Sequence, residues 1–200
     1  MTHARKSAAV WGVLLAAGTS SRFGDENKLL VEIDGVPLVR RVAERVVASS
    51  LAATVVVTGF ESERVEDALS DMKLEFARNP DFRSGMAASL ACGVAVVDGD
   101  ASGAMIVLGD MPGVTTGLVD RLVGAFENED CHKITYPAGT DGRQGNPVIW
   151  PRRFFPDLLS LTGDRGAKAL IAANPDDTLA VSVDDGVAFE DIDTRSDLSE

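Results

Sequence analysis

Short apolar runs alternate with longer segments of helical periodicity along almost the whole chain. Residues 10–15, 54–58 and 104–108 are runs rich in Val, Ile and Leu, and residues 38–47 show apolar positions at helical spacing. Strands that are apolar on both faces and separated by helices are typical of a parallel sheet covered on both sides. We therefore expect an α/β protein, a three-layer α/β/α sandwich around a mostly parallel, Rossmann-like sheet.

The other expected elements follow from the same patterns and from turn residues. We expect the last strands to add antiparallel pairing. In such sheets ligands bind at the carboxyl ends of the strands, so the chemistry should lie in the loops after Leu15, Val57 and Leu108. The further helices are expected at residues 61–72, 86–97, 116–126, 152–161 and 166–173, and the further strands at 74–77, 133–137, 147–150, 179–183 and 187–192.

The charge balance restricts the class of partner. Lys and Arg total 19 against 31 Asp and Glu, for a net charge of −12. Because nucleic acid binding depends mainly on Lys and Arg contacts to phosphates, we expect no nucleic acid partner. A local cluster of donors and cations can still bind a small anion, and we expect a triphosphate to arrive with its metal. The 200 residues suit one domain, residues 1–200, with residues 1–8 as a flexible N-terminus.

The N-terminal segment has two interpretations. Arg5 and Lys6 followed by the apolar residues 8–17 have the pattern of a signal peptide. The same residues also fit a buried first strand that runs into a functional loop, and we favour the strand. No other segment approaches the length needed to span a bilayer, so we expect a cytoplasmic protein with no membrane partner.

The loop after the first strand carries the most informative pattern. Residues 15–24 read LAAGTSSRFG, and DENK follows. Glycines let backbone amides turn toward an anion, Thr19 and Ser20 add hydroxyl donors, and Arg22 and Lys28 add two cations suited to a polyphosphate. Neither a Walker A motif nor GxGxxG is present. By composition alone, a solvated Gly/Ser turn is an equally good interpretation.

The order of these residues resembles the signature loop, LAAGxSxRxG followed by Lys, of nucleotidyltransferases related to the molybdenum cofactor cytidylyl- and guanylyltransferases. The resemblance implies the fold of the nucleotide-diphospho-sugar transferases and transfer of a nucleoside monophosphate from an NTP to a phosphorylated acceptor, with release of pyrophosphate. Further segments resemble that family in the same order: Asn79-Pro80, residues 85–90 (GMAASL), 109–112 (GDMP), 145–148 (GNPV), 162–167 (TGDRGA) and 191–194 (DIDT).

The resemblance assigns the metal ligands. Asp110 stands at the carboxyl end of a strand, where a carboxylate can hold Mg²⁺ against the α-phosphate. Asp193 is the expected second ligand and Asp191 its competitor, and either could be surface charge. By itself Asp110 could also cap a helix. Mg²⁺ is the expected cofactor.

The implied reaction is an in-line attack by an acceptor phosphate oxygen on the α-phosphorus. A terminal phosphate needs no general base, since its second pKa is about 6. Arg22, Lys28 and the loop amides would stabilise the departing pyrophosphate, and with Asp110 they are the expected catalytic groups. Acceptor binding is assigned to Asn146, Asp164 and Arg165, although Asp164 could merely cap a helix. The nucleotide-binding residues implied by the resemblance are Leu15, Ala16, Ala17, Gly18, Thr19, Ser20, Arg22, Lys28, Thr58, Gly59, Gly85 and Ser89, of which Ser89 could equally be an ordinary helix residue.

The substrates are the least determined part. The Leu-Ala-Ala-Gly opening favours CTP over GTP, although many cytidylyl members carry Gln where Met111 stands. The expected acceptor is molybdopterin or the molybdenum cofactor, with a molybdoenzyme as a transient partner. The alternatives are transfer to a sugar- or alcohol-phosphate, a non-catalytic molybdenum cofactor carrier, and a regulatory nucleotide-binding module.

Overall fold

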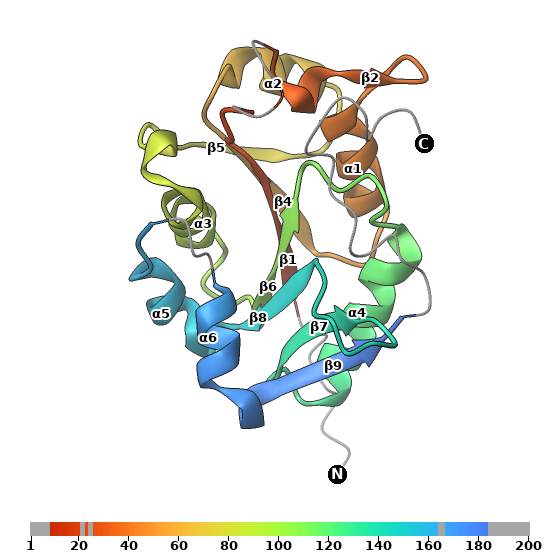
Figure 1. Ribbon diagram of the computed structural model, residues 1–200, viewed down its shortest axis with the longest axis vertical. Helices are drawn as coiled ribbons and strands as arrows, with labels where there is room; N and C mark the ends of the chain where they lie inside the picture. Colours follow the sequence, from red (N-terminus) through yellow and green to blue (C-terminus); the bar gives the residue numbers. More distant parts are fainter. Residues whose placement is uncertain (1–8, 21–22, 24–25, 164–166, 184–200) are drawn as a thin grey trace.

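The computed structural model describes residues 9–20, 23, 26–163 and 167–183. Seven strands form one sheet in the order β5-β4-β1-β6-β8-β7-β9, and β2 and β3 form a separate two-stranded hairpin (Figure 1). The strands are β1 (Val10–Ala16), β2 (Glu32–Ile33), β3 (Val36–Pro37), β4 (Ala53–Thr58), β5 (Glu75–Arg78), β6 (Gly103–Leu108), β7 (Ile134–Ala138), β8 (Val148–Pro151) and β9 (Thr178–Ser182).

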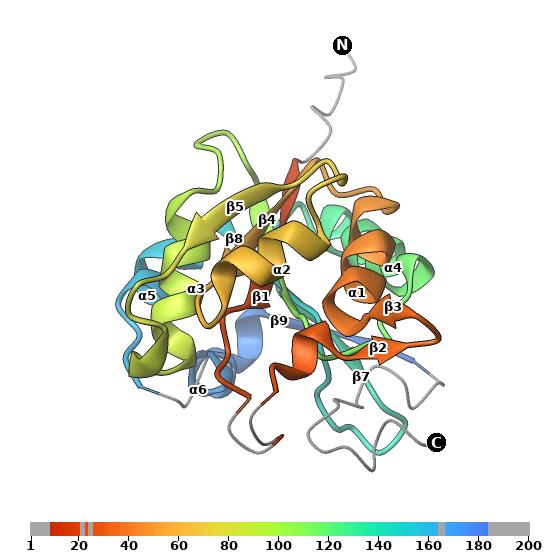
Figure 2. The same cartoon turned by 90° about the horizontal axis from the view of Figure 1, so that it is seen from above.

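Helices cover both faces of the sheet, as the sequence predicted. Viewed in Figures 1 and 2, α1 and α4 lie on one side of the sheet and α3, α5 and α6 on the other. Short 3₁₀ turns precede or follow several of them. The helices are α1 (Leu38–Val47), α2 (Ser62–Ala68), α3 (Met86–Ala95), α4 (Thr116–Asn128), α5 (Phe155–Leu159) and α6 (Lys168–Ala173), and the 3₁₀ turns are η1 (Lys28–Leu30), η2 (Phe82–Ser84), η3 (Arg152–Phe154) and η4 (Pro175–Asp177).

Alternation along β1 divides the core into two layers. Leu14 and Ala16 pack with the apolar faces of α1, α2 and α4, whereas Val13 and Leu15 pack with those of α3, α5 and α6. Successive side chains of a strand point to opposite faces, so a central strand that is apolar throughout must be covered on both sides. The three-layer α/β/α architecture is therefore confirmed.

The strand directions confirm the parallel sheet and correct one expectation. β5, β4, β1 and β6 pair in parallel, and β8 pairs antiparallel with both β6 and β7. β9 pairs in parallel with β7, so the expectation of antiparallel pairing was wrong for β9 and belongs to β8 instead. The connection from β7 to β8 contains no helix and returns directly, so these neighbouring strands are antiparallel. The helices α5 and α6 lie between β8 and β9, and β9 returns to pair in parallel with β7. The strand expected at residues 187–192 lies outside the described residues.

Two expected helices are much shorter than the periodicity predicted. The segment 152–161 divides into η3 and α5, and Pro156 lies in the first turn of α5. Proline has no backbone N–H and fits only the first turn of a helix, so a continuous helix through this position is disfavoured. The helix expected at residues 61–72 ends at Ala68.

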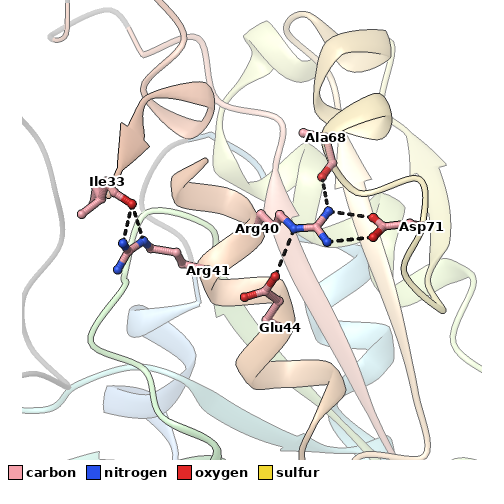
Figure 3. A network of polar contacts seen from close by, with 6 residues as sticks. All are labelled: Ile33, Arg40, Arg41, Glu44, Ala68 and Asp71. Carbon is pink, nitrogen blue, oxygen red and sulfur yellow. Dashed lines mark hydrogen bonds and ion pairs between the residues drawn. The ribbon is translucent and has the colours of Figure 1, made fainter. Parts of the chain in front are cut away.

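A group of polar contacts from α1 marks the end of α2 (Figure 3). The Arg40 guanidinium donates hydrogen bonds to the Ala68 carbonyl at 3.0 Å and to both carboxylate oxygens of Asp71 at 2.7 and 2.8 Å. Its Nε donates to Glu44, and Arg41 donates to the Ile33 carbonyl of β2 at 2.9 Å. These contacts join α1 to the end of α2 and to the β2–β3 hairpin. The hydrogen bond from Arg40 lowers the pKa of Asp71 to about 2.

Along the described residues no helix is both long enough and apolar enough to cross a bilayer.

Candidate active site

Three loops meet at the carboxyl edge of the sheet, where the sequence predicted the chemistry. β1 lies between β4 and β6, with Ala16 beside Thr58 and Leu15 beside Leu108. The Gly109 N–H, which follows β6, donates to the Leu15 carbonyl at 3.0 Å. On the other side, the Phe60 N–H after β4 donates to the Ala17 carbonyl at 3.3 Å. The loops after β1, β4 and β6 are therefore held together by backbone contacts.

Lys28 and Asp110 form an ion pair at this edge. Lys28 Nζ lies 2.6 Å from Asp110 Oδ2, and the two side chains are 15% and 20% exposed. Asp110 Oδ1 is buried and has no hydrogen-bond partner among the residues that the structure describes. An unpaired buried carboxylate oxygen is costly in free energy, and such groups in proteins often mark the position of an ion or ligand. Asp110 therefore has one oxygen paired with Lys28 and a second oxygen that can accept a ligand, at the place where the three loops meet.

Asp110 can serve as a metal ligand. No group of three or more His, Cys, Asp and Glu side chains that could hold a metal is found within residues 9–20, 23, 26–163 and 167–183. Mg²⁺ needs no such group, because it keeps several waters and takes one or two carboxylates together with substrate phosphates. One carboxylate with an open, buried oxygen therefore fits this ion.

The β1 loop presents mainly its backbone. Leu15, Ala16 and Ala17 are buried, while Gly18 and Thr19 are exposed. Buried apolar side chains leave only backbone groups for a ligand, and the role of these residues beside a nucleotide stays a prediction.

Ser20 uses its hydroxyl within the loop. Its backbone has φ 54°, and its Oγ accepts a hydrogen bond from the Lys28 N–H at 3.1 Å and donates to Asn27 Oδ1 at 3.4 Å. The hydroxyl therefore helps to shape the turn that presents Lys28. Direct contact between Ser20 and a nucleotide stays a prediction.

The end of β4 is fixed by Glu66 of α2. The buried Thr58 hydroxyl donates to Glu66 Oε1 at 2.9 Å, and the Arg78 guanidinium donates to both oxygens of Glu66 at 2.8 and 2.7 Å. The hydrogen bond from Arg78, followed by that from Thr58, holds the pKa of Glu66 below its usual value. An ionised Glu66 thus fixes Thr58 at the end of β4. The next residue, Gly59, has no room for a side chain, because an added Cβ atom would lie 2.6 Å from Phe82 Cβ.

Gly85 and Ser89 lie at the start of α3, the helix that follows β5 and η2 in the sequence. Gly85 has φ 104°, a conformation that favours glycine, and immediately precedes the helix. The buried Ser89 hydroxyl accepts a hydrogen bond from Asn79 Nδ2 at 3.0 Å, and the Asn79 N–H donates to the Thr58 carbonyl at 2.8 Å. The segments predicted to lie beside the nucleoside are therefore linked to the end of β4.

The acceptor side is only partly described. Val148 of β8 lies beside Ile106 of β6, and this register places Asn146 at the carboxyl edge of the sheet. The Gly163 carbonyl accepts from the Ala87 N–H of α3 at 3.3 Å, so the segment that precedes Asp164 meets the start of α3. The predicted site residues Arg22, Asp164, Arg165 and Asp193, and the competitor Asp191, lie outside the described residues.

Two residues of the site received no role from the sequence. Asn27 caps the η1 turn that begins with Lys28, and the known preference of Asn for this position was a usable signal. Glu66 had no such signal, because its contacts with Thr58 and Arg78 arise only when β4, α2 and β5 pack together.

The chain is similar to several known proteins. The family model described as "MobA-like NTP transferase domain" matches residues 12–178. A "Probable molybdenum cofactor guanylyltransferase" of Natronomonas pharaonis is 35% identical over 126 residues, which are 63% of this chain and 60% of that protein's length. The "Nicotine blue oxidoreductase" of Paenarthrobacter nicotinovorans is 28% identical over 189 residues, 92% of each protein. A crystal structure of Rv0371c from Mycobacterium tuberculosis H37Rv matches with a TM-score of 0.84 and 25% identity, over 96% of this chain and 97% of that one.

Proposed function

The chain belongs to the MobA-like NTP transferase family, and from this premise we propose that it is a Mg²⁺-dependent enzyme that transfers a nucleoside monophosphate to the phosphate of molybdopterin or the molybdenum cofactor. Pyrophosphate is the second product. The family match supports nucleotidyl transfer as the type of reaction. We propose the acceptor because the sequence resembles molybdenum cofactor nucleotidyltransferases and a guanylyltransferase of this pathway is similar over 63% of the chain.

The observation that carries the proposal is the Lys28–Asp110 pair. It combines a cation and a carboxylate with an open, buried oxygen at the carboxyl edge of a parallel sheet. A binding protein needs an anion site, but it does not need a metal-binding carboxylate beside that site. This combination therefore favours catalysis over the carrier and the regulatory module.

The residues of the chain act by position and charge. Mg²⁺, when bound, would draw electron density from the phosphate oxygens and neutralise their charge. Asp110 would hold it, with Asp193 as the proposed second ligand. Lys28 and Arg22, together with the amides of the β1 loop, would stabilise the negative charge that develops on the departing pyrophosphate. The acceptor phosphate is its own nucleophile, so the remaining task is alignment, which we assign to Asn146, Asp164 and Arg165.

The base of the NTP has two candidates. We propose CTP, because residues 15–18 read LAAG, the opening of the cytidylyl branch. GTP is the second candidate, because the relative from Natronomonas pharaonis is named a guanylyltransferase. Both nucleotides are served by the same Lys28–Asp110 chemistry, since the base lies away from the reacting phosphate.

The experiment follows pyrophosphate release. Purified protein is incubated with Mg²⁺ and molybdenum cofactor, and with CTP, GTP or ATP in separate reactions. We expect acceptor-dependent release with CTP and none without acceptor. Release with GTP and not with CTP would show that GTP is the donor. Release with a sugar-phosphate instead of the molybdenum cofactor would show that the acceptor is a sugar-phosphate.

Two further results would overturn the proposal. Tight NTP binding without any release would indicate a carrier or a regulatory module. Redox turnover of nicotine blue, without pyrophosphate release from any NTP, would indicate an activity like that named for the relative from Paenarthrobacter nicotinovorans.

A further inference from the structure

We propose that Asn27 is a positioning residue, which closes the β1 loop against the peptide of Phe60 and thereby holds Lys28 in place. The inference rests on the proposed function, because it assigns a role to Asn27 within that site. Asn27 lies directly before Lys28 in the sequence, and its side chain bonds to Leu29, Ser20 and Phe60.

The Asn27 side chain is buried and joins three segments. It is 2% exposed, and its Oδ1 accepts hydrogen bonds from the Leu29 N–H at 3.1 Å and from Ser20 Oγ at 3.4 Å. Its Nδ2 donates to the Phe60 carbonyl at 3.4 Å. A buried amide requires such partners, so these contacts define where the side chain can lie. Asn27 therefore links the start of η1, the middle of the β1 loop and the loop after β4.

The main chain of Phe60 contacts the β1 loop at two points. Its N–H donates to the Ala17 carbonyl at 3.3 Å, where the loop begins, and its carbonyl accepts from Asn27, where the loop ends. The preceding residue is confined, since a Cβ on Gly59 would lie 2.6 Å from Phe82 Cβ and 2.9 Å from Ala17 Cβ. The confined main chain at Gly59 and Phe60 therefore holds Ala17 and Asn27 in fixed positions relative to each other.

The Ser20 hydroxyl connects the Asn27 side chain to the Lys28 backbone. The Lys28 N–H donates to Ser20 Oγ at 3.1 Å, and the same hydroxyl donates to Asn27 Oδ1. Loss of the Asn27 side chain would leave this hydroxyl free to turn and would uncap the η1 turn at Leu29. Small displacements of a positioned charge strongly reduce its interaction with a substrate. We therefore expect loss of the Asn27 side chain to weaken the interaction of Lys28 with a phosphate group.

A double-mutant cycle with inorganic pyrophosphate as the probe tests the inference. Binding of pyrophosphate with Mg²⁺ is measured by calorimetry for the wild type, Asn27→Ala, Lys28→Ala and the double variant. We expect Asn27→Ala to weaken binding by about 10-fold in the wild type, an effect of the size seen for supporting residues of functional groups. In the Lys28→Ala background the same substitution should cost about 2-fold or less, since sites that act through one another are not additive.

Two variants control for general loss of structure. Asn79→Ala removes another buried asparagine, which contacts Ser89 on the nucleoside side, and its effect on pyrophosphate binding should be equal in both backgrounds. Asn27→Asp keeps the oxygen that caps Leu29 and loses the donation to Phe60, so it serves where Asn27→Ala does not fold. We expect a smaller loss from Asn27→Asp, about 3-fold, again dependent on Lys28.

Each outcome decides the inference. Equal losses from Asn27→Ala in both backgrounds, or no loss, would show that Asn27 does not act through Lys28, and the proposed function would stand. A wild type that binds neither pyrophosphate nor any NTP would overturn the proposed function, and this inference with it.

Discussion

Two ion pairs of nearly equal length occur in different settings of the same fold. Lys28 Nζ lies 2.6 Å from Asp110, and Arg40 Nη1 lies 2.7 Å from Asp71. In the Arg40–Asp71 pair both oxygens of Asp71 are bonded to Arg40 (Figure 3). The Asp71 side chain is 68% exposed. In the Lys28–Asp110 pair one Asp110 oxygen is bonded, and the other is buried with no partner in the described part of the chain.

The difference shows that ion-pair length says little about role. In the Arg40–Asp71 pair both carboxylate oxygens are bonded and the Asp71 side chain is mostly exposed, so the pair is screened by water and offers no open acceptor to a ligand. The Lys28–Asp110 pair is withdrawn from water and unsaturated, so its charges act more strongly and one acceptor is open. We therefore expect substitutions at the sheet edge to affect turnover, and those between α1 and α2 to affect stability alone.

Replacing either aspartate gives the largest contrast. Asp110→Ala removes the carboxylate proposed to hold the metal, and we expect pyrophosphate release to fall by about 10³-fold. Asp71→Ala is the matched control and should retain turnover within about 2-fold, because surface pairs of this kind contribute little. Steady-state pyrophosphate release measures both. Comparable losses from the two substitutions would break the distinction between the pairs.

Replacing either cation gives the next largest contrast. Lys28→Ala removes one group that stabilises the departing pyrophosphate, and we expect a loss of about 10²-fold in kcat. Arg40→Ala, in the other pair, should leave kcat unchanged. Folding of both variants is checked by circular dichroism before the assay. A folded Lys28→Ala protein with unimpaired turnover would remove Lys28 from the mechanism.

Gly59→Ala disturbs the frame of the sheet-edge site without touching either pair. The added Cβ would lie 2.6 Å from Phe82 Cβ and 2.9 Å from Ala17 Cβ, so the two loops must separate. We expect a loss of about 1–3 kcal/mol in the free energy of unfolding, typical of overpacking, and reduced turnover. Gly117→Ala is the control, since a Cβ there has nothing within 4 Å. Urea denaturation and the pyrophosphate assay together show whether the loops must be in contact for activity.

The smallest expected effect is the pH dependence of the Arg40–Asp71 pair. The pKa of Asp71 is about 2 in the folded protein against 3.8 ordinarily. A lowered carboxyl pKa adds stability above the ordinary pKa, and this contribution disappears as the pH falls through the folded value. Asp71→Asn should therefore be slightly less stable than the wild type at pH 7, and the difference should narrow below about pH 4. Urea denaturation across this range measures it, and a difference that grows toward acid pH would contradict the assignment.

The sequence predicted the elements and the location of the site, and its limits have physical causes. The apolar runs of β1, β4 and β6 placed the three loops at one edge, because parallel strands end together. The family resemblance is confirmed by the match over residues 12–178. The hydrogen bonds from Ser20 to Asn27 and from Thr58 to Glu66 could not be predicted from the sequence, since they depend on tertiary packing. The parallel direction of β9 was missed for the same reason, because strand direction depends on which neighbour the strand joins.

The most direct test of nucleotidyl transfer at the Lys28–Asp110 site follows the phosphates of the nucleotide. The protein is given CTP labelled at the α-phosphorus or at the γ-phosphorus, with Mg²⁺ and molybdenum cofactor, and the products are separated. The account predicts α-label in the cofactor product and γ-label in pyrophosphate, both lost in Asp110→Ala. Label that stays in the nucleotide, for CTP and for GTP alike, or that leaves as free monophosphate without acceptor, would contradict it.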